Sequence, residues 1–210
     1  MIKKSEEYMA YAKVQADDMG IIPIIGEVNT DMAEVVVECI DLALKSGFKT
    51  ITFHIDTNGG WNDSCNAIIA KMNSLPHIDF TGLVMGKARS NGLRLLQHCT
   101  NRLAFRSSTI QFHWGSLEMK NGDLAAIMDN ADTDPIAHRK RTLGIIAQEI
   151  ADATGLSLEK LYALARYEQD LNSEEAMEFG FLDEILPDLP AKRAGKRLAK
   201  GKKEKVKKGK

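Results

Sequence analysis

The spacing of the hydrophobic positions changes repeatedly along the 210 residues of this chain. Strand-like segments, either short and apolar or alternating apolar and polar, occupy 21–26, 49–56, 80–85, 103–106, 109–115 and 181–186. Helix-like segments, with apolar residues three and four apart, lie at 32–45, 62–74, 119–127, 135–154, 156–166 and 173–180, and another begins at Leu93. Strands that alternate with helices predict βαβ units, so we expect an α/β fold with a mostly parallel sheet and flanking helices.

The two ends of the chain differ from this middle part. Residues 1–20 hold only a weak helical pattern and are interpreted as an N-terminal arm, whereas 21–190 are predicted to form one domain. Residues 191–210 contain nine Lys and two Arg against one Glu, a net charge of +10, which leaves −11 for residues 1–190 of a chain with a total of −1. Like charges repel and offer no apolar groups to bury, so we expect a disordered tail. Such a tail either touches nucleic acid or an acidic partner, or is only solvated.

Composition narrows the class of protein. Hydrophobic residues make up 44% of the chain and charged residues 27%, as in ordinary globular domains with a sizeable core. No apolar run reaches the roughly 18 residues of a membrane span, and the polar N-terminus does not resemble a signal peptide, so we expect a cytoplasmic protein with no membrane partner. The three cysteines are far apart and form no Cys-x-x-Cys pair, which indicates neither a zinc site nor a disulfide framework. We therefore expect no metal and no other cofactor.

Ser90 lies where the predicted strand 80–85 gives way to a helix. The intervening turn, Gly-Lys-Ala-Arg-Ser-Asn-Gly at 86–92, places a serine at the end of a strand and at the N-terminus of a helix. In that position a hydroxyl is exposed and the following N–H groups can face a developing negative charge. This is the logic of a nucleophile elbow, although the Gly-x-Ser-x-Gly spelling is absent. The turn alone is weak evidence, because most such turns only connect elements.

Two other polar segments also end predicted strands. Asn58-Gly59-Gly60 follows the strand 49–56, and His113 lies near the end of the strand 109–115. In a parallel sheet, binding sites lie beyond the carboxyl ends of the strands. We therefore expect both segments to form one site with Ser90.

A serine hydroxyl becomes a good nucleophile only when a base takes its proton. Among five histidines His113 is the best placed base, while the others fit a strand interior, a helix or the surface (His54, His98, His77 and His138). The base needs an orienting acid, and Glu168 and Asp170 both qualify, since spacing does not choose between them. The backbone N–H groups of Gly60 and Asn91 are suited by position to an oxyanion hole. The alternative is a strand-end histidine satisfied by backbone and two ordinary loop acids.

Six short motifs follow one another between residues 21 and 186. They are Gly-Glu-Val-Asn (26–29), Asn-Gly-Gly (58–60), Gly-x-Ala-x-Ser-x-Gly (86–92), Phe-His (112–113), Thr-Gly-Leu-Ser (154–157) and Ser-Glu-Glu-Ala-Met-Glu-Phe-Gly-Phe-Leu-Asp (173–183). In this order they resemble the ClpP family, the proteolytic subunit of the Clp protease and its phage-encoded relatives, within the crotonase-like fold. No single motif is decisive, but the ordered set is fairly specific.

The resemblance implies a serine endopeptidase with Ser90 as nucleophile, His113 as base and Glu168 as the third catalytic residue. It places the oxyanion donors at the Gly60 and Asn91 amides. It also implies a crotonase/ClpP-like fold in which a long handle helix, here about 123–153, joins two rings. The implied substrates are unfolded polypeptides, the implied assembly is a homo-oligomer of heptameric rings that encloses the active sites, and the implied partner is a hexameric AAA+ unfoldase such as ClpX or ClpA.

Several residues depart from the family pattern. Asn58 replaces a proline, Arg89 replaces a small residue beside the nucleophile, and Trp114 follows the histidine where a polar residue is usual. Glu168 replaces an aspartate, and Tyr167 stands where many members have an arginine that ties rings together.

These departures leave other functions open. One is a catalytically inactive ring subunit, and another is a phage capsid-maturation (prohead) protease whose basic tail touches DNA or scaffold. A third, a coenzyme A-thioester enzyme on the same general fold, would not need a histidine after the serine, so the pair Ser90 and His113 argues against it.

Overall fold

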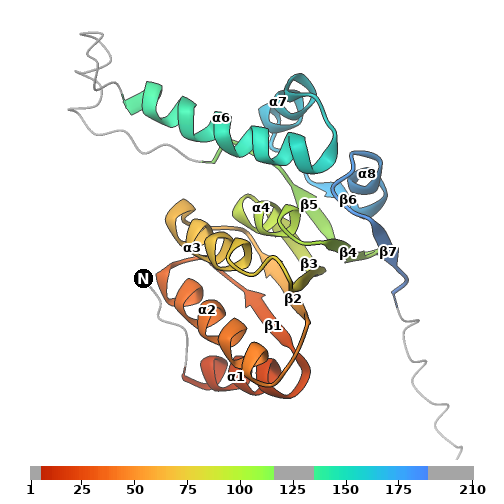
Figure 1. Cartoon of the computed structure of the whole chain (residues 1–210). Helices are drawn as coiled ribbons and strands as arrows, with labels where there is room; N and C mark the ends of the chain where they lie inside the picture. Colours follow the sequence, from red (N-terminus) through yellow and green to blue (C-terminus); the bar gives the residue numbers. More distant parts are fainter. Residues whose placement is uncertain (1–5, 116–134, 189–210) are drawn as a thin grey trace, which may run out of the picture.

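The computed structural model describes residues 6–115 and 135–188, and it contains the predicted alternation of strands and helices (Figure 1). The strands are β1 (Ile21–Ile25), β2 (Thr50–Thr57), β3 (Asp79–Arg89), β4 (Asn101–Phe105), β5 (Thr109–Gln111), β6 (Leu171–Asn172) and β7 (Glu184–Leu186). The helices are α1 (Glu6–Met19), α2 (Thr30–Lys45), α3 (Asn62–Asn73), α4 (Asn91–Gln97), α6 (Pro135–Thr154), α7 (Leu158–Arg166) and α8 (Ser173–Glu178). None of these helices is long and apolar enough to cross a bilayer.

The strands form one sheet that is almost entirely parallel, as predicted. Its main path runs β1-β2-β3-β4-β7, and every neighbouring pair on this path is parallel. The edge position of β1 suits its sequence, because Pro23 lacks an N–H and would break the ladder of a central strand. The carboxyl ends of β2, β3 and β5 therefore lie at one side of the sheet, where the sequence predicts a site.

Strand β3 is longer than its hydrophobic pattern predicts and has two partners in succession. Residues 81–84 pair with β4, and residues 87–89 pair with β5. The segment 86–89, which the sequence predicts as part of a tight turn, is thus strand, and the turn itself is confined to Ser90. The extension arises from pairing with β5, a long-range contact that local periodicity does not register.

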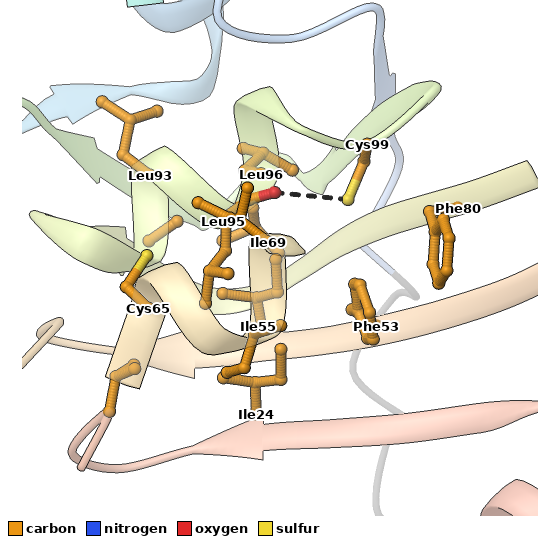
Figure 2. Packing of buried hydrophobic residues seen from close by; sticks show 14 of the residues in the cluster. Ile24, Phe53, Ile55, Cys65, Ile69, Phe80, Leu93, Leu95, Leu96 and Cys99 are labelled. Carbon is orange, nitrogen blue, oxygen red and sulfur yellow. Dashed lines mark hydrogen bonds between the residues drawn. The ribbon is translucent and has the colours of Figure 1, made fainter. Parts of the chain in front are cut away.

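Helices α2, α3 and α4 lie side by side along the sheet (Figure 1). Figure 2 shows the core beneath them, where Leu95 and Leu96 of α4 lie close to Ile69 of α3 and Ile55 of β2. Phe53 and Phe80 stack across β2 and β3 with ring centroids 5.5 Å apart. The core is therefore continuous between the helical layer and the strands that carry the site.

Helix α1 is formed by residues of the segment 1–20 that was interpreted as an N-terminal arm. It packs against α2, and Ala12 and Ala16 on that face are fully buried. Small side chains at i and i+4 allow this close approach despite the weak apolar pattern of the helix.

Some predicted boundaries differ from the structure. The strand predicted over 109–115 ends at Gln111, and the one predicted over 181–186 begins at Glu184. The predicted handle helix corresponds to α6, which lies above α4 in Figure 1 and contacts α4 and α7. The predicted helix 119–127, the start of the predicted handle helix and the basic tail 191–210 lie outside the described residues.

Candidate active site

Ser90 is the only residue between the end of β3 and the start of α4. Its backbone has φ 52° and ψ −122°, a region that a non-glycine residue enters at a cost of about 1–3 kcal/mol. Two hydrogen bonds hold this conformation, from the Ser90 N–H to the Gln111 carbonyl (3.1 Å) and from the Arg94 N–H to the Ser90 carbonyl (3.1 Å). The Ser90 side chain does not cap α4, so the hydroxyl is free for another role.

The loop after β2 approaches Ser90 so closely that only glycine fits there. A Cβ atom on Gly59 would lie 2.7 Å from the Ser90 Cβ and 2.9 Å from the Asn91 nitrogen, and one on Gly60 would lie 2.4 Å from the Val28 carbonyl oxygen. The buried Thr57 hydroxyl fixes the loop, because it donates to the Gly26 carbonyl and accepts from the Gly59 N–H at 2.9 Å. Gly59 is thus required by packing against the serine turn, and Gly60 by packing against the backbone of Val28.

Two backbone N–H groups beside Ser90 have no acceptor among the described residues. In the bridge between Val28 and Gly60, the Val28 N–H donates to the Gly59 carbonyl and the Trp61 N–H to the Val28 carbonyl, which leaves the Gly60 N–H unused. The Asn91 N–H is in the first turn of α4, where no intrahelical acceptor exists. These are the two donors that the sequence suggests for an oxyanion.

The Asn91 side chain organises the same corner, a role that sequence reasoning missed. Its Nδ2 donates to the Gly60 carbonyl at 2.7 Å and to Asn62 Oδ1 at 2.9 Å. Asn91 is buried, so these bonds are shielded from water and fix the Gly60–Trp61 peptide. Sequence periodicity gives no signal for such a bond, because its acceptor belongs to another loop.

His113 follows β5 by two residues, and its side chain is 20% exposed. Its Nδ1 accepts a hydrogen bond from the Gly115 N–H at 3.2 Å and lies 3.7 Å from Glu168 Oε1. A ring nitrogen that accepts carries no proton, so this arrangement corresponds to the tautomer protonated on Nε2. No hydrogen bond within the described residues joins His113 to the Ser90 hydroxyl. In unliganded enzymes such catalytic bonds are often long and tighten only when substrate binds.

The two candidate acids have different partners. Glu168 lies at ion-pair distance from His113, whereas the Asp170 carboxylate pairs with the guanidinium of Arg89. Glu168 also has a left-handed backbone, with φ 46°, and its carbonyl accepts from Gln111 Nε2 at 2.6 Å. Because the Asp170 carboxylate is already paired with the Arg89 guanidinium, the geometry favours Glu168 as the acid that interacts with the imidazole.

A cavity of about 360 Å³ brings most of these groups together. Its lining combines Ser90, His113 and the loop after β2 with aromatic residues and three apolar residues of α6. The lining residues are Asn58, Gly60, Trp61, Asn62, Ser90, Asn91, Phe112, His113, Trp114, Gly115, Leu143, Ile146 and Ile150. The α6 residues among them, Leu143, Ile146 and Ile150, lie three and four positions apart, a helical spacing that is visible in the sequence. Their role at the site was not predicted.

The remaining described histidines lie elsewhere. His98 Nε2 is 3.7 Å from Glu149 Oε2, where burial lowers the pKa of the imidazole and the nearby carboxylate opposes this shift. Burial also lowers the pKa of His54, within β2, and His77 is exposed in a turn. His113 is thus the one histidine in the described part of the chain that lines the cavity with Ser90.

Comparisons with known proteins give a consistent result. The family model described as Clp protease matches residues 3–188. The curated protein named ATP-dependent Clp protease proteolytic subunit from Streptococcus salivarius is 26% identical over 181 residues, which cover 85% of this chain and 89% of the relative. The protein of the same name from Streptococcus pneumoniae (strain Hungary19A-6) is similar to the same extent.

Proposed function

The chain belongs to the Clp protease family and is a ClpP-like serine-type peptidase, and we propose that Ser90, His113 and Glu168 are its catalytic residues. The observation that carries this assignment is the shared cavity, in which Ser90 and His113 lie beside the two unused N–H groups of Gly60 and Asn91. Glu168 approaches the imidazole from outside the cavity lining.

The proposed reaction follows from these positions. His113 takes the proton of the Ser90 hydroxyl while Ser90 Oγ attacks the peptide carbonyl. The N–H groups of Gly60 and Asn91 stabilise the oxyanion that forms. His113 then gives the proton to the leaving amine, and water hydrolyses the acyl-enzyme by the reverse sequence. For His113 to receive a proton on Nε2, Nδ1 must carry the other one, so Nδ1 exchanges the Gly115 N–H for the Glu168 carboxylate.

The substrates that we propose are unfolded polypeptides. An extended chain exposes its backbone carbonyls and can enter an enclosed chamber, and the apolar face of α6 offers contact for a hydrophobic side chain next to the cleaved bond. We further propose that the protein acts as a homo-oligomer of heptameric rings fed by an AAA+ unfoldase. The names of the relatives, which describe a proteolytic subunit of an ATP-dependent protease, support a multi-subunit protease that uses ATP. The inactive ring subunit and the capsid-maturation protease are less favoured, because the matched relatives are named as proteolytic subunits of an ATP-dependent protease.

The catalytic assignment is tested by active-site labelling. A fluorophosphonate probe should label the native protein, and Ser90→Ala should remove the label. Ser107→Ala is the matched control, since Ser107 is also accessible but bonds to Asp188 away from the cavity. Labelling that survives Ser90→Ala, or is lost in Ser107→Ala, would contradict the assignment.

The basic segment 191–210 is proposed to bind nucleic acid through its net charge of +10. Deleting it should abolish any salt-dependent binding of duplex DNA and leave fluorophosphonate labelling intact. Equal DNA binding with and without the segment would exclude this role.

A further inference from the structure

Arg89 and Gln111 are cross-strand partners that both reach the loop of Glu168. They face each other in the register of β3 and β5. The Arg89 guanidinium pairs with the Asp170 carboxylate, and Gln111 Nε2 donates to the Glu168 carbonyl at 2.6 Å. The loop is therefore held at two points, on either side of Gln169, by neighbours on the strands that carry Ser90 and His113.

The held segment contains the strained residue. Glu168 has a left-handed backbone, which a non-glycine residue adopts only when its surroundings enforce it. The Glu168 side chain is 65% exposed and makes its described contact only with His113, so side-chain packing does not enforce the conformation. The described groups that hold the loop are Arg89 and Gln111, together with the pairing of β6 with β5 that begins at Leu171.

Arg89 also reaches the other side of the nucleophile. Its Nη1 lies 3.4 Å from Asn58 Oδ1, in the loop that carries Gly59 and Gly60. Its Nε is buried and has no hydrogen-bond partner in the described residues. An unsatisfied buried donor is costly, so this placement is a poor one for stability alone.

We propose that Arg89 is a positioning residue, which acts on catalysis by holding the Glu168 loop against His113. The inference rests on the proposed function of Ser90, His113 and Glu168. Among the described contacts, none joins the Arg89 side chain to Ser90, His113 or Glu168. It replaces the small side chain expected beside the nucleophile, and with Asp170 and Asn58 it forms a bridge from the acid loop to the loop of the proposed oxyanion hole.

The test is a double-mutant cycle between Arg89→Met and Glu168→Gln. The readouts are the rate of Ser90 labelling by a fluorophosphonate and kcat and KM for a fluorogenic peptide. Arg89→Met should lower kcat about 10- to 100-fold with little change in KM, because a misplaced catalytic group slows chemistry without weakening binding. In the Glu168→Gln background the same change should alter kcat less than about twofold, since there is no carboxylate left to position.

Two further variants keep the test decisive. Asp170→Asn removes the other end of the bridge and should give a loss similar to that of Arg89→Met. Lys71→Met is the control, because Lys71 and Asp41 form an ion pair of similar exposure between α2 and α3, and it should leave kcat unchanged. Equal effects of Arg89→Met in both backgrounds, or wild-type kcat in Arg89→Met, would overturn the positioning role.

Amide hydrogen exchange separates this inference from the proposed function. Exchange at residues 167–172 should be faster in Arg89→Met than in the wild type and unchanged in Lys71→Met. If the wild type is not labelled at Ser90, the proposed function fails and the positioning role falls with it, while faster exchange would still show that Arg89 orders the loop. If labelling succeeds but exchange is unchanged, only the inference about Arg89 fails.

Discussion

The contact between α4 and α6 offers a quantitative test of the structure. Arg94, four residues after Ser90, is 7% exposed and donates to Glu149 from Nε (2.7 Å) and Nη2 (3.1 Å). Its Nη1 donates to Asn66 at 2.7 Å. We consider two substitutions, Glu149→Leu and Arg94→Met, and predict that the first destabilises the protein more.

The two substitutions differ in destabilisation because each leaves a different charged group without its partner. Glu149→Leu leaves a buried guanidinium with one neutral acceptor, and removing one member of a buried ion pair typically costs about 3–5 kcal/mol. Because Glu149 itself is 30% exposed and water reaches its site, we expect the lower end, about 3 kcal/mol. Arg94→Met leaves a carboxylate that water can solvate, so we expect about 1 kcal/mol. The double variant should be more stable than Glu149→Leu alone, because it contains no stranded charge.

Urea unfolding followed by tryptophan fluorescence measures these differences. All variants should be compared at one protein concentration, since subunit association contributes to apparent stability. The dependence of the free energy of unfolding on urea should stay unchanged while the midpoint moves. A larger loss in Arg94→Met than in Glu149→Leu, or strictly additive losses in the double variant, would refute the reasoning.

Three other predictions concern the serine turn, pH and the cysteines. Gly59→Ala should lower Ser90 labelling by about 100-fold or more, because its Cβ would displace the serine, whereas Gly47→Ala, which shares a positive φ but has open space around it, should label normally. Burial lowers the pKa of His54 and His98, so these histidines bind protons in the unfolded chain before they do so in the native protein as pH falls. The free energy of unfolding, measured with urea, should therefore decrease from pH 7 to pH 5. His54→Gln should make this decrease shallower. Burial raises the pKa of Cys39 to about 11 and that of Cys65 and Cys99 to about 12. Iodoacetamide at pH 8 should therefore leave all three unmodified in the native protein and alkylate them in urea. Rapid alkylation of the native protein would contradict their burial.

Local patterns predicted the parts of the fold that local physics determines. The alternation in β2 and the capped helical repeat of α2, where Asn29 Oδ1 accepts the Met32 N–H at 3.0 Å, are visible as a period of two and a period near four. The proline in β1 indicated an edge strand, and the structure confirms it. The position of Ser90 between strand and helix was also predictable, since both neighbouring elements have strong patterns.

Other features depend on distant residues and left no local trace. β6 has two residues, too few for any periodicity, and it exists because it pairs with β5. The same is true of the extension of β3 to Arg89. For the acid, spacing alone kept Glu168 and Asp170 equivalent. The contact of Glu168 with His113 and the pairing of Asp170 with Arg89 distinguish them, and both depend on distant residues.

The strand β6 has a consequence for how the protein is made. Glu168 lies just before β6, and β6 runs directly into α8, whose start is fixed by a reciprocal bond pair between Asn172 and Glu175. A chain emerging from the ribosome therefore displays its proposed nucleophile and imidazole well before the segment that anchors the carboxylate has been translated. Synthesis in this direction therefore leaves the proposed catalytic triad incomplete until the segment from Glu168 to α8 has been made.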